Sequence, residues 1–237
     1  MKNWRALLLV YRELDVRLRV GALRHRRFHH RASDSTISDA VESFGGFPDL
    51  VRELTNGAVS VETRIAEMKR PLVTLTRRAP NEFWPSPDDV DLRTHAPAGS
   101  CESVFVFWPQ HDFESGSSVP GSAWGLGMGA SAWSNGATYA AVANAPTSSW
   151  KNEARGEVWL HEWLHGVCHH FTGRGCKMPE RDADGAELHG YTRSVTRGWT
   201  DYYRDLMNGL VMEGGEPRGI PTLAWAQTAD AARVAAR

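Results

Sequence analysis

Cysteine and long apolar runs are both scarce in this sequence. Three cysteines in 237 residues cannot form the disulfide framework of a small secreted domain, and no CxxC spacing is present. No apolar run approaches the roughly 20 residues that a membrane-spanning helix needs. We therefore expect three reduced thiols and no transmembrane segment, with a single Cys168–Cys176 bridge left open for an exported protein.

The chain also has no large excess of positive or of negative charge. The chain has 27 Lys and Arg against 28 Asp and Glu, and its 10 Trp and 8 Phe exclude an intrinsically disordered chain. This composition and length predict a soluble globular protein with a sizeable core. The apolar stretch at 6–11 runs into charged residues and is about half as long as a signal-peptide core. The cytoplasm is therefore the default compartment, with secretion left open.

Positive charge is concentrated at the start of the chain. Residues 1–31 hold nine basic groups against two acidic ones, and the stretch Arg24–Arg31 could touch phosphate or an acidic surface. Only four of the 27 basic residues are lysine, so arginine is common throughout the chain. No helix-turn-helix, zinc-finger or RNA-binding signature accompanies the stretch. We interpret it as a solvated turn and expect no nucleic-acid partner.

Strands are predicted where apolar residues alternate or run continuously. The strongest is 103–108, which is apolar almost throughout and is therefore expected to be buried on both faces. Further strands are expected over 8–18, 59–65, 71–75 and 138–142. Residues 79–100 are interpreted as an ordered surface loop, and the Gly/Ser-rich segment 115–136 as a loop that shapes a cleft.

Helices are predicted from apolar spacing and from capping residues. Ser35–Thr36 can cap a helix that Gly45–Gly46 should end, and Pro48 can begin a second short helix. Longer helices are expected over 153–171, which glycines at 173 and 175 end, and over 199–210. The Ala/Arg tail from 229 is interpreted as a frayed terminal helix.

The most informative motif is an HExxH formed by His161, Glu162 and His165 inside the predicted helix 153–171. Residues four apart lie one turn apart on one helix face, so both imidazoles can bind one ion. Glu162 then projects beside an open metal position, where it can take a proton from metal-bound water. Chance would produce about 0.03 such matches in a chain of this composition. We therefore predict a Zn²⁺ site that makes a water molecule nucleophilic near neutral pH.

A third ligand is needed to complete a catalytic zinc site. His169 continues the spacing, but three ligands along one straight helix would span roughly 12 Å, which is too far for one ion. The segment 178–191 is long enough to fold back on the helix. It offers four side chains with ligand atoms: Asp182, Asp184, Glu187 and His189. Of these, Glu187 is the first choice, Asp184 the second and His189 the third.

The HExxH helix, the glycine break and the acidic segment after it resemble the zincin metallopeptidases, most closely their gluzincin and aspzincin branches. The resemblance covers about residues 103–211. It implies a small mixed sheet packed on the active-site helix, an edge strand that pairs with an extended peptide, and a Zn²⁺ cofactor. The metzincin branch is excluded, because Phe171 stands where its pattern has His. The Glu-xxx-Asp helix of the gluzincins is not matched cleanly either, because Tyr191 stands four residues after Glu187.

Zincin chemistry also needs a donor for the oxyanion of the tetrahedral intermediate. The candidates are Tyr191, Tyr202, Tyr203 and His189. Tyr191 ranks slightly ahead because it adjoins the ligand segment, whereas aromatic packing explains a pair such as Tyr202–Tyr203 more often than catalysis does.

Together these patterns predict an α+β, zincin-like fold with further helices C-terminal to the HExxH helix. Residues 1–100 are expected to form an N-terminal α/β portion that supports or covers the cleft, and residues 101–237 the catalytic portion. The expected function is zinc-dependent hydrolysis of a peptide or protein substrate, with Glu162 as the base and Tyr191 as the oxyanion donor. The alternative is a metal-binding effector or binding protein whose zinc site is structural or degenerate.

Overall fold

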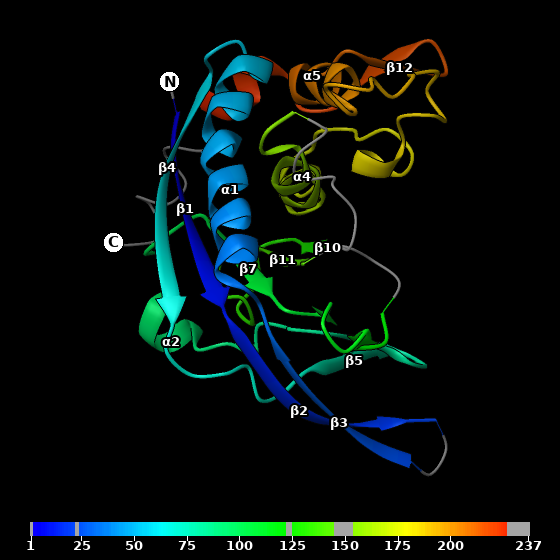
Figure 1. Ribbon diagram of the computed structural model, residues 1–237. Coiled ribbons are helices and arrows are strands. Elements are labelled where there is room, and N and C mark those ends of the chain that lie inside the picture. The colour runs from blue at the N-terminus through cyan, green and yellow to red at the C-terminus, as the bar shows by residue number, and fades with distance from the viewer. Residues whose placement is uncertain (1, 22–23, 122–124, 145–153, 227–237) are drawn as a thin grey trace.

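A mixed β-sheet forms the centre of the computed structural model, which describes residues 2–21, 24–121, 125–144 and 154–226 (Figure 1). Its strands are β1 (Lys2–Tyr11), β4 (Val59–Met68), β7 (Ser103–Trp108), β10 (Gly125–Met128) and β11 (Thr138–Ala143). The order of the five strands is β10-β11-β7-β1-β4. Only β10 runs antiparallel to its neighbour. The predicted α+β class with a small mixed sheet is confirmed.

The central strands are buried on both faces, as predicted for 103–108. All six residues of β7 are buried. Alternate residues along β1 and β7 enter two separate cores because successive side chains of a strand point to opposite faces. The core under the helices receives Leu8, Val10, Phe105 and Phe107. The core on the other face receives Leu7, Leu9, Val104 and Val106.

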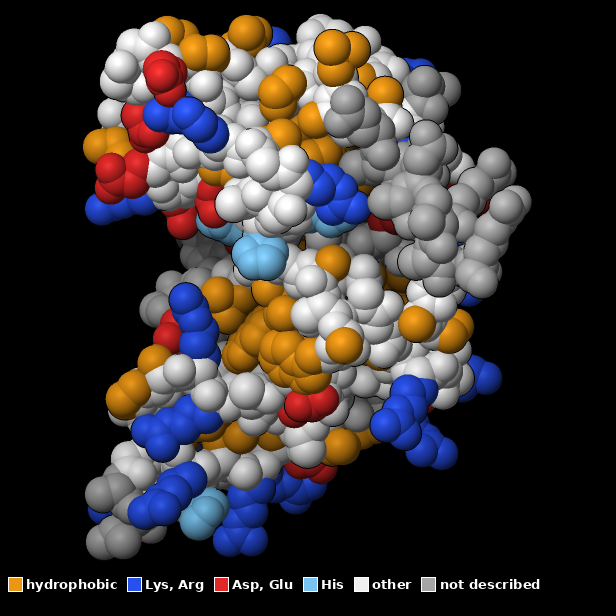
Figure 2. All heavy atoms as spheres, turned by 180° about the vertical axis from the view of Figure 1, so that it is seen from behind, with side chains coloured by type: hydrophobic (Ala, Val, Ile, Leu, Met, Phe, Trp, Pro, Cys, Tyr) orange, Lys and Arg blue, Asp and Glu red, His pale blue; other side chains and the backbone are white. Residues whose placement is uncertain are grey.

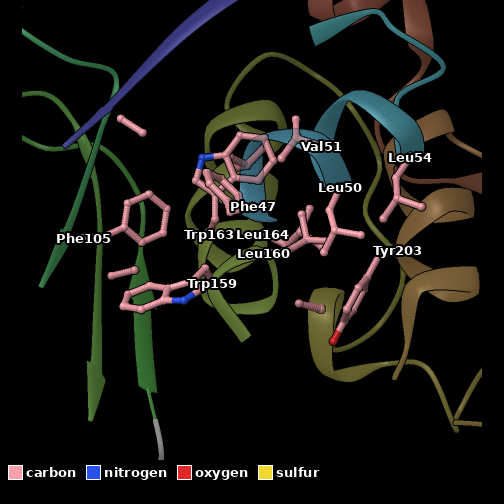
Figure 3. Packing of buried hydrophobic residues seen from close by; sticks show 14 of the residues in the cluster. Phe47, Leu50, Val51, Leu54, Phe105, Trp159, Leu160, Trp163, Leu164 and Tyr203 are labelled. Atoms are coloured by element: carbon pink, nitrogen blue, oxygen red, sulfur yellow. The ribbon is translucent and has the colours of Figure 1, made fainter. Parts of the chain in front are cut away.

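Two long helices cover one face of the sheet: α1 (Asp34–Leu54) and α4 (Glu157–Thr172). The shorter helix α5 (Thr200–Asn208) packs beside them. Figure 3 shows the apolar side chains of α1 directed toward those of α4, with Phe105 reaching them from the sheet and Tyr203 from α5. The α4 side chains in this contact are Trp159, Leu160, Trp163 and Leu164, all at most 1% exposed. This packing buries one side of the HExxH helix and leaves the other side for the site.

The prediction of two short helices separated by Gly45–Gly46 is wrong, because α1 is continuous through both glycines and through Pro48. Its apolar face continues across them from Phe44 to Phe47, and both side chains are fully buried. Burial of that face outweighs the low helix propensity of the three residues. Gly46 also has a packing role, since a Cβ atom there would lie 2.6 Å from the carbonyl oxygen of Arg155.

The two glycines should therefore respond in opposite ways to alanine. Gly45→Ala should raise the free energy of unfolding by about 1 kcal/mol, because a Cβ meets no atom within 4 Å there and alanine favours the helix. Gly46→Ala should lower it by about 1–3 kcal/mol, because the backbone at Arg155 has to move. Urea unfolding of both variants beside the parent measures this; equal effects would show that α1 and Arg155 are not in this contact.

The single strand predicted over 8–18 is divided in two. It breaks at Arg12, and its second half, β2 (Glu13–Val20), pairs antiparallel with β3 (Arg24–Arg31). The basic stretch is therefore a strand, not the predicted turn. Phe28 and His30, two residues apart, are both buried, while the arginines remain exposed. Figure 1 shows this hairpin extending away from the central sheet.

The segment between β4 and β7 is more structured than expected. The strand predicted over 71–75 is reduced to one bridge, between Leu72 and Leu14. The expected surface loop contains the end of a β-hairpin and a short helix: β5 (Thr76–Ala79), β6 (Glu82–Trp84) and α2 (Leu92–His95). These pieces cover the second core through Phe83 and Leu92.

The remaining elements are short. They are β8 (His111–Asp112), β9 (Ser117–Ser118), the 3₁₀ helix η1 (Asp182–Asp184), β12 (Val211–Glu213) and β13 (Glu216–Arg218). The cleft-shaping segment 115–136 thus contains β9 and the edge strand β10. The predicted helix 153–171 begins at Glu157, and the predicted tail helix from 229 lies outside the described residues.

The two portions divided at residue 100 share one sheet. Strands β1 and β4 come from the first portion and pair beside β7 from the second, and α1 packs on α4. All three cysteines are free thiols, so the Cys168–Cys176 bridge is not formed. Among the described residues, we find no helix that is long and apolar enough to span a membrane.

Candidate metal centre

The two histidines of the HExxH motif lie one turn apart on the open side of α4. Their Nε2 atoms both face the carboxylate of Asp184, at 3.4 Å from His161 to Oδ1 and 3.8 Å from His165 to Oδ2. One ligand atom from each of the three residues lies within 4.8 Å of the others. These distances fit three ligands bound about 2 Å from one ion. The group could therefore hold a metal ion.

A tight turn brings Asp184 back to the helix. Arg181 and Asp182 both have positive φ angles, 65° and 36°, and lead into η1. Two contacts hold this turn: Ala183 is buried in the core, and the Tyr202 hydroxyl donates a hydrogen bond to the carbonyl oxygen of Asp182. The backbone of Asp184, the third candidate ligand, is therefore held in place.

The other candidates of the acidic segment are placed elsewhere. Glu187, the first choice for the third ligand, is exposed and stands outside the group of converging ligand atoms, because the chain already reaches the histidines three residues earlier. His189 directs its Nε2 to the carbonyl oxygen of Glu180, at 3.2 Å. Tyr191 donates its hydroxyl to Asp205 at 2.5 Å, so that hydroxyl is not directed at the histidines.

Each histidine also has a hydrogen-bond partner at Nδ1, the ring nitrogen that does not face Asp184. His165 Nδ1 lies 2.7 Å from Oδ1 of Asp182, and His161 Nδ1 lies 2.7 Å from the hydroxyl of Tyr203. Histidines that bind metals usually donate their second ring nitrogen to such a partner, which fixes the tautomer and leaves the other nitrogen free for the ion. The sequence did not predict Asp182 or Tyr203 as hydrogen-bond partners of the histidines. Their distances along the chain from the HExxH motif belong to no recognised pattern.

A buried carboxylate lies close to the Tyr203 hydroxyl. It belongs to Glu157, in the first turn of α4, which accepts a hydrogen bond from the backbone N–H of Trp199 at 3.2 Å. Burial raises the pKa of Glu157 and places that of Tyr203 well above its usual value. Behind His161 there is therefore first the hydroxyl of Tyr203, which lies 2.7 Å from its Nδ1, and then the buried carboxylate of Glu157.

The electrostatic environment makes the two imidazoles different. Burial, with a smaller contribution from His165, lowers the pKa of His161 to about 4, so this ring is neutral and can act as a ligand. Burial also acts to lower the pKa of His165, but the hydrogen bond to Asp182 and its negative charge outweigh it and raise that pKa. A cation would compete with the proton for His165.

Glu162 is buried beside the two histidines but is not one of the three residues whose ligand atoms converge. It is 5% exposed, and its Oε2 has no hydrogen-bond partner among the described residues. Burial raises its pKa to about 7. The other oxygen, Oε1, lies 4.0 Å from Nε2 of His161, next to the converging ligand atoms.

The edge strand β10 approaches the helix closely because of its glycines. A Cβ atom at Gly125 would lie 2.4 Å from Oε1 of Glu162, and one at Gly127 would lie 2.1 Å from its backbone carbonyl. Any side chain at these positions would displace Glu162 or the strand. The glycines therefore form the wall of the site against which the carboxylate lies.

The Tyr203 contact gives a prediction with a matched control. Tyr203→Phe should weaken zinc affinity by about 10- to 100-fold, the usual cost of losing a hydrogen-bond partner of a metal-bound histidine. Tyr191→Phe should leave the affinity unchanged, because its hydroxyl is bonded to Asp205 away from the histidines. Competition with a chromogenic chelator measures the zinc affinity of both variants. Equal affinities would show that the Tyr203 hydroxyl does not support the binding of zinc by His161.

These residues open into a cavity of about 690 Å³. Its wall is formed by Arg78, Gly125, Leu126, Gly127, Glu157, Val158, His161, Glu162, His165, Asp184, Arg193, Trp199 and Tyr203. Figure 2 shows histidine side chains inside a hollow that crosses this face of the molecule. No family model, curated protein or solved structure matches the chain.

Proposed function

We propose that this protein is a zinc-dependent metallopeptidase that hydrolyses peptide or protein substrates in the cleft beside α4. One observation supports it most: the ligand atoms of His161, His165 and Asp184 converge next to the buried, unpaired carboxylate of Glu162. A purely structural site would not need that carboxylate, which is costly to bury without a partner.

The donor set favours zinc. Two imidazole nitrogens and one carboxylate oxygen suit this ion, and three protein ligands leave a position open for reactants, as in catalytic rather than structural sites. A Zn²⁺ ion held there supplies Lewis-acid chemistry, polarising a carbonyl oxygen and making a water molecule acidic near neutral pH. His161, His165 and Asp184 are the residues that would hold it.

Glu162 is the residue that we assign to move the proton. Its unpaired oxygen can accept a proton from the attacking water and deliver it to the departing amine. On the strand side, Gly125 lies against the carboxylate and Gly127 against the backbone carbonyl of Glu162, and the opposite side of α4 is buried in the core. The position of Glu162 is therefore fixed before any substrate arrives, which is what a general base requires.

The edge strand supplies a reason why the substrate would be a peptide. β10 is the terminal strand in the order of the sheet, and it runs directly past Glu162 and His165. An extended chain can add to such an edge through backbone hydrogen bonds, independently of its side chains. Pairing of this kind would carry a peptide carbonyl across the histidines.

Digestion of casein by the purified protein tests the proposal. We expect new peptide termini detected by mass spectrometry, loss of cleavage after the metal is removed with a chelator, and its return when zinc is added. Cleavage that survives complete metal removal would contradict a metal-dependent mechanism. Stoichiometric zinc without any cleavage would favour the alternative of a binding or effector protein.

A further inference from the structure

A separate cavity, of about 320 Å³, lies at the C-terminal end of α4 and shares no wall residue with the cavity of the candidate metal centre. Its wall is formed by the start of β1, the residues before β7 and β11, and the end of α4 with the turn that follows. The charged residues of this wall are Lys2, Arg5, Glu102 and Arg174. Three cationic side chains therefore stand against one carboxylate.

The single carboxylate of the wall is already bound by Arg5. Oε1 of Glu102 accepts a hydrogen bond from Nη2 of Arg5 at 2.7 Å, and Oε2 accepts one from Nε at 3.1 Å and one from the backbone N–H at 2.7 Å. Burial acts to raise the pKa of Glu102, but the hydrogen bonds and charge of Arg5 outweigh it and lower that pKa. Glu102 is therefore ionised and neutralises Arg5.

The other two cations have no carboxylate at ion-pair distance among the residues that the structure describes. Lys2 is half-buried, and only its backbone N–H has a close partner, the carbonyl oxygen of Ala58. Arg174 donates from Nη1 to His170, to Nδ1 at 3.1 Å and to the carbonyl oxygen at 3.5 Å. A guanidinium has five N–H donors, so most of those of Arg174 remain for another partner.

His170 adds a buried donor to the same wall. Burial, with smaller contributions from the charges of Arg174 and Lys2, lowers the pKa of His170 to about 4, so its ring is neutral. An arginine can only donate, so Nδ1 accepts and the proton of the ring is on Nε2. Nε2 is buried and has no hydrogen-bond partner among the described residues. A buried donor of this kind is costly to leave unpaired, and an acceptor bound beside the ring would supply its partner.

We propose that this cavity binds one small oxyanion, a carboxylate or phosphate group, between Lys2 and Arg174, with the Nε2–H of His170 as a further donor; the peptidase function is not needed for it. Arginine binds either group through two parallel, charge-assisted hydrogen bonds, and lysine adds a point charge. The bound anion would connect the first strand of the sheet to the end of the helix that carries His161 and His165. It would therefore stabilise the fold in proportion to its concentration.

Calorimetric titration of the zinc-loaded protein with inorganic phosphate and with succinate, at an ionic strength held constant with sodium chloride, tests the site. We expect saturable binding of one molecule per chain for at least one of the two anions, and a Tm that rises with the concentration of that anion. Tighter binding of phosphate assigns the site to phosphate groups, and tighter binding of succinate to carboxylates. Absence of saturable binding for both anions overturns the inference.

Variants with a matched control locate the bound anion. Arg174→Gln and Lys2→Gln should each weaken binding by roughly 10- to 100-fold, the range expected for a lost hydrogen bond to a charged group. Lys177→Gln removes the same charge from a nearby residue outside the cavity wall, whose amine lies 3.6 Å from Glu216. This control should leave the affinity unchanged. Equal weakening by all three variants would show an effect of net charge alone and contradict the site.

His165→Ala separates this site from the candidate metal centre, because either anion can also bind to a zinc ion. The variant lacks one of the three candidate ligands but keeps every residue of the cavity wall. It should bind the anion as tightly as the parent does, and so should the parent after its metal is removed with a chelator. Loss of binding in both proteins would place the anion on the metal and overturn the inference.

Discussion

Replacing Glu162 with Gln should leave zinc bound and lower kcat/KM for peptide hydrolysis by about 10²- to 10⁴-fold, the range of general-base contributions. The side chain projects from the same helix as the two histidines but is not one of the three converging ligands. Glutamine keeps its size and some of its hydrogen bonding, and it cannot take up a proton. The measurement is zinc content beside the rate of casein cleavage, for parent and variant.

The control for this variant is Glu180→Gln, which removes an exposed carboxylate outside the cavity wall. It should change neither zinc content nor rate. Equal cleavage by the parent and Glu162→Gln, both with zinc bound, would show that Glu162 is not the base. Loss of zinc from Glu162→Gln would instead make it a ligand and contradict the arrangement that we describe.

Asp184→Asn should weaken zinc binding more than any other change in the acidic segment. One of only three ligands is lost, so the effect should exceed the roughly 10- to 100-fold cost of removing a partner behind a ligand. His161→Ala and His165→Ala should have effects at least as large, because each also removes a ligand. Titration of the metal-free proteins with zinc measures the three affinities.

Glu187→Gln is the decisive comparison for that result, because it removes a neighbouring carboxylate that is exposed and outside the ligand group. Its zinc affinity should match that of the parent. If Glu187→Gln loses zinc and Asp184→Asn keeps it, the third ligand is Glu187, which the sequence ranks first. The position of the η1 turn, which brings Asp184 to the histidines, would then be wrong.

The parts of the site that lie within one helix were predictable from the sequence. The spacing of His161 and His165 fixes their relation through the helix repeat alone, and the apolar spacing of Leu164, Val167 and Phe171 indicates the side of the helix that is buried. The strand 103–108 was predictable for a similar reason, since a run of apolar residues is stable only where both faces are covered.

The position of the third candidate ligand depends on a backbone detail that residue patterns do not contain. Asp184 rather than Glu187 reaches the histidines because Arg181 and Asp182 adopt positive φ angles, which non-glycine residues rarely do. The hydroxyl of Tyr203 is likewise positioned by the docking of α5, 42 residues along the chain from His161. Contacts of this kind follow from the tertiary fold, so the sequence could only list candidates.

Local signals also failed where packing overrides them. Gly45, Gly46 and Pro48 are strong helix breakers in isolation, yet α1 continues because its buried face spans them. The sequence favours a solvated turn for the basic stretch Arg24–Arg31, because arginine is common throughout the chain. The alternation of buried Phe28 and His30 with the exposed residues Arg27, His29 and Arg31 is a strand pattern, and β2 pairs with this strand.

The most direct test of the central claim is the position of the ion itself. Anomalous X-ray diffraction at the zinc edge, from crystals of the zinc-loaded protein, locates the metal without reference to any assumed chemistry. Our account predicts one peak bound by Nε2 of His161, Nε2 of His165 and the carboxylate of Asp184, with no fourth protein ligand. A peak elsewhere, or an ion enclosed by four protein ligands with no position open to the cavity, would contradict it.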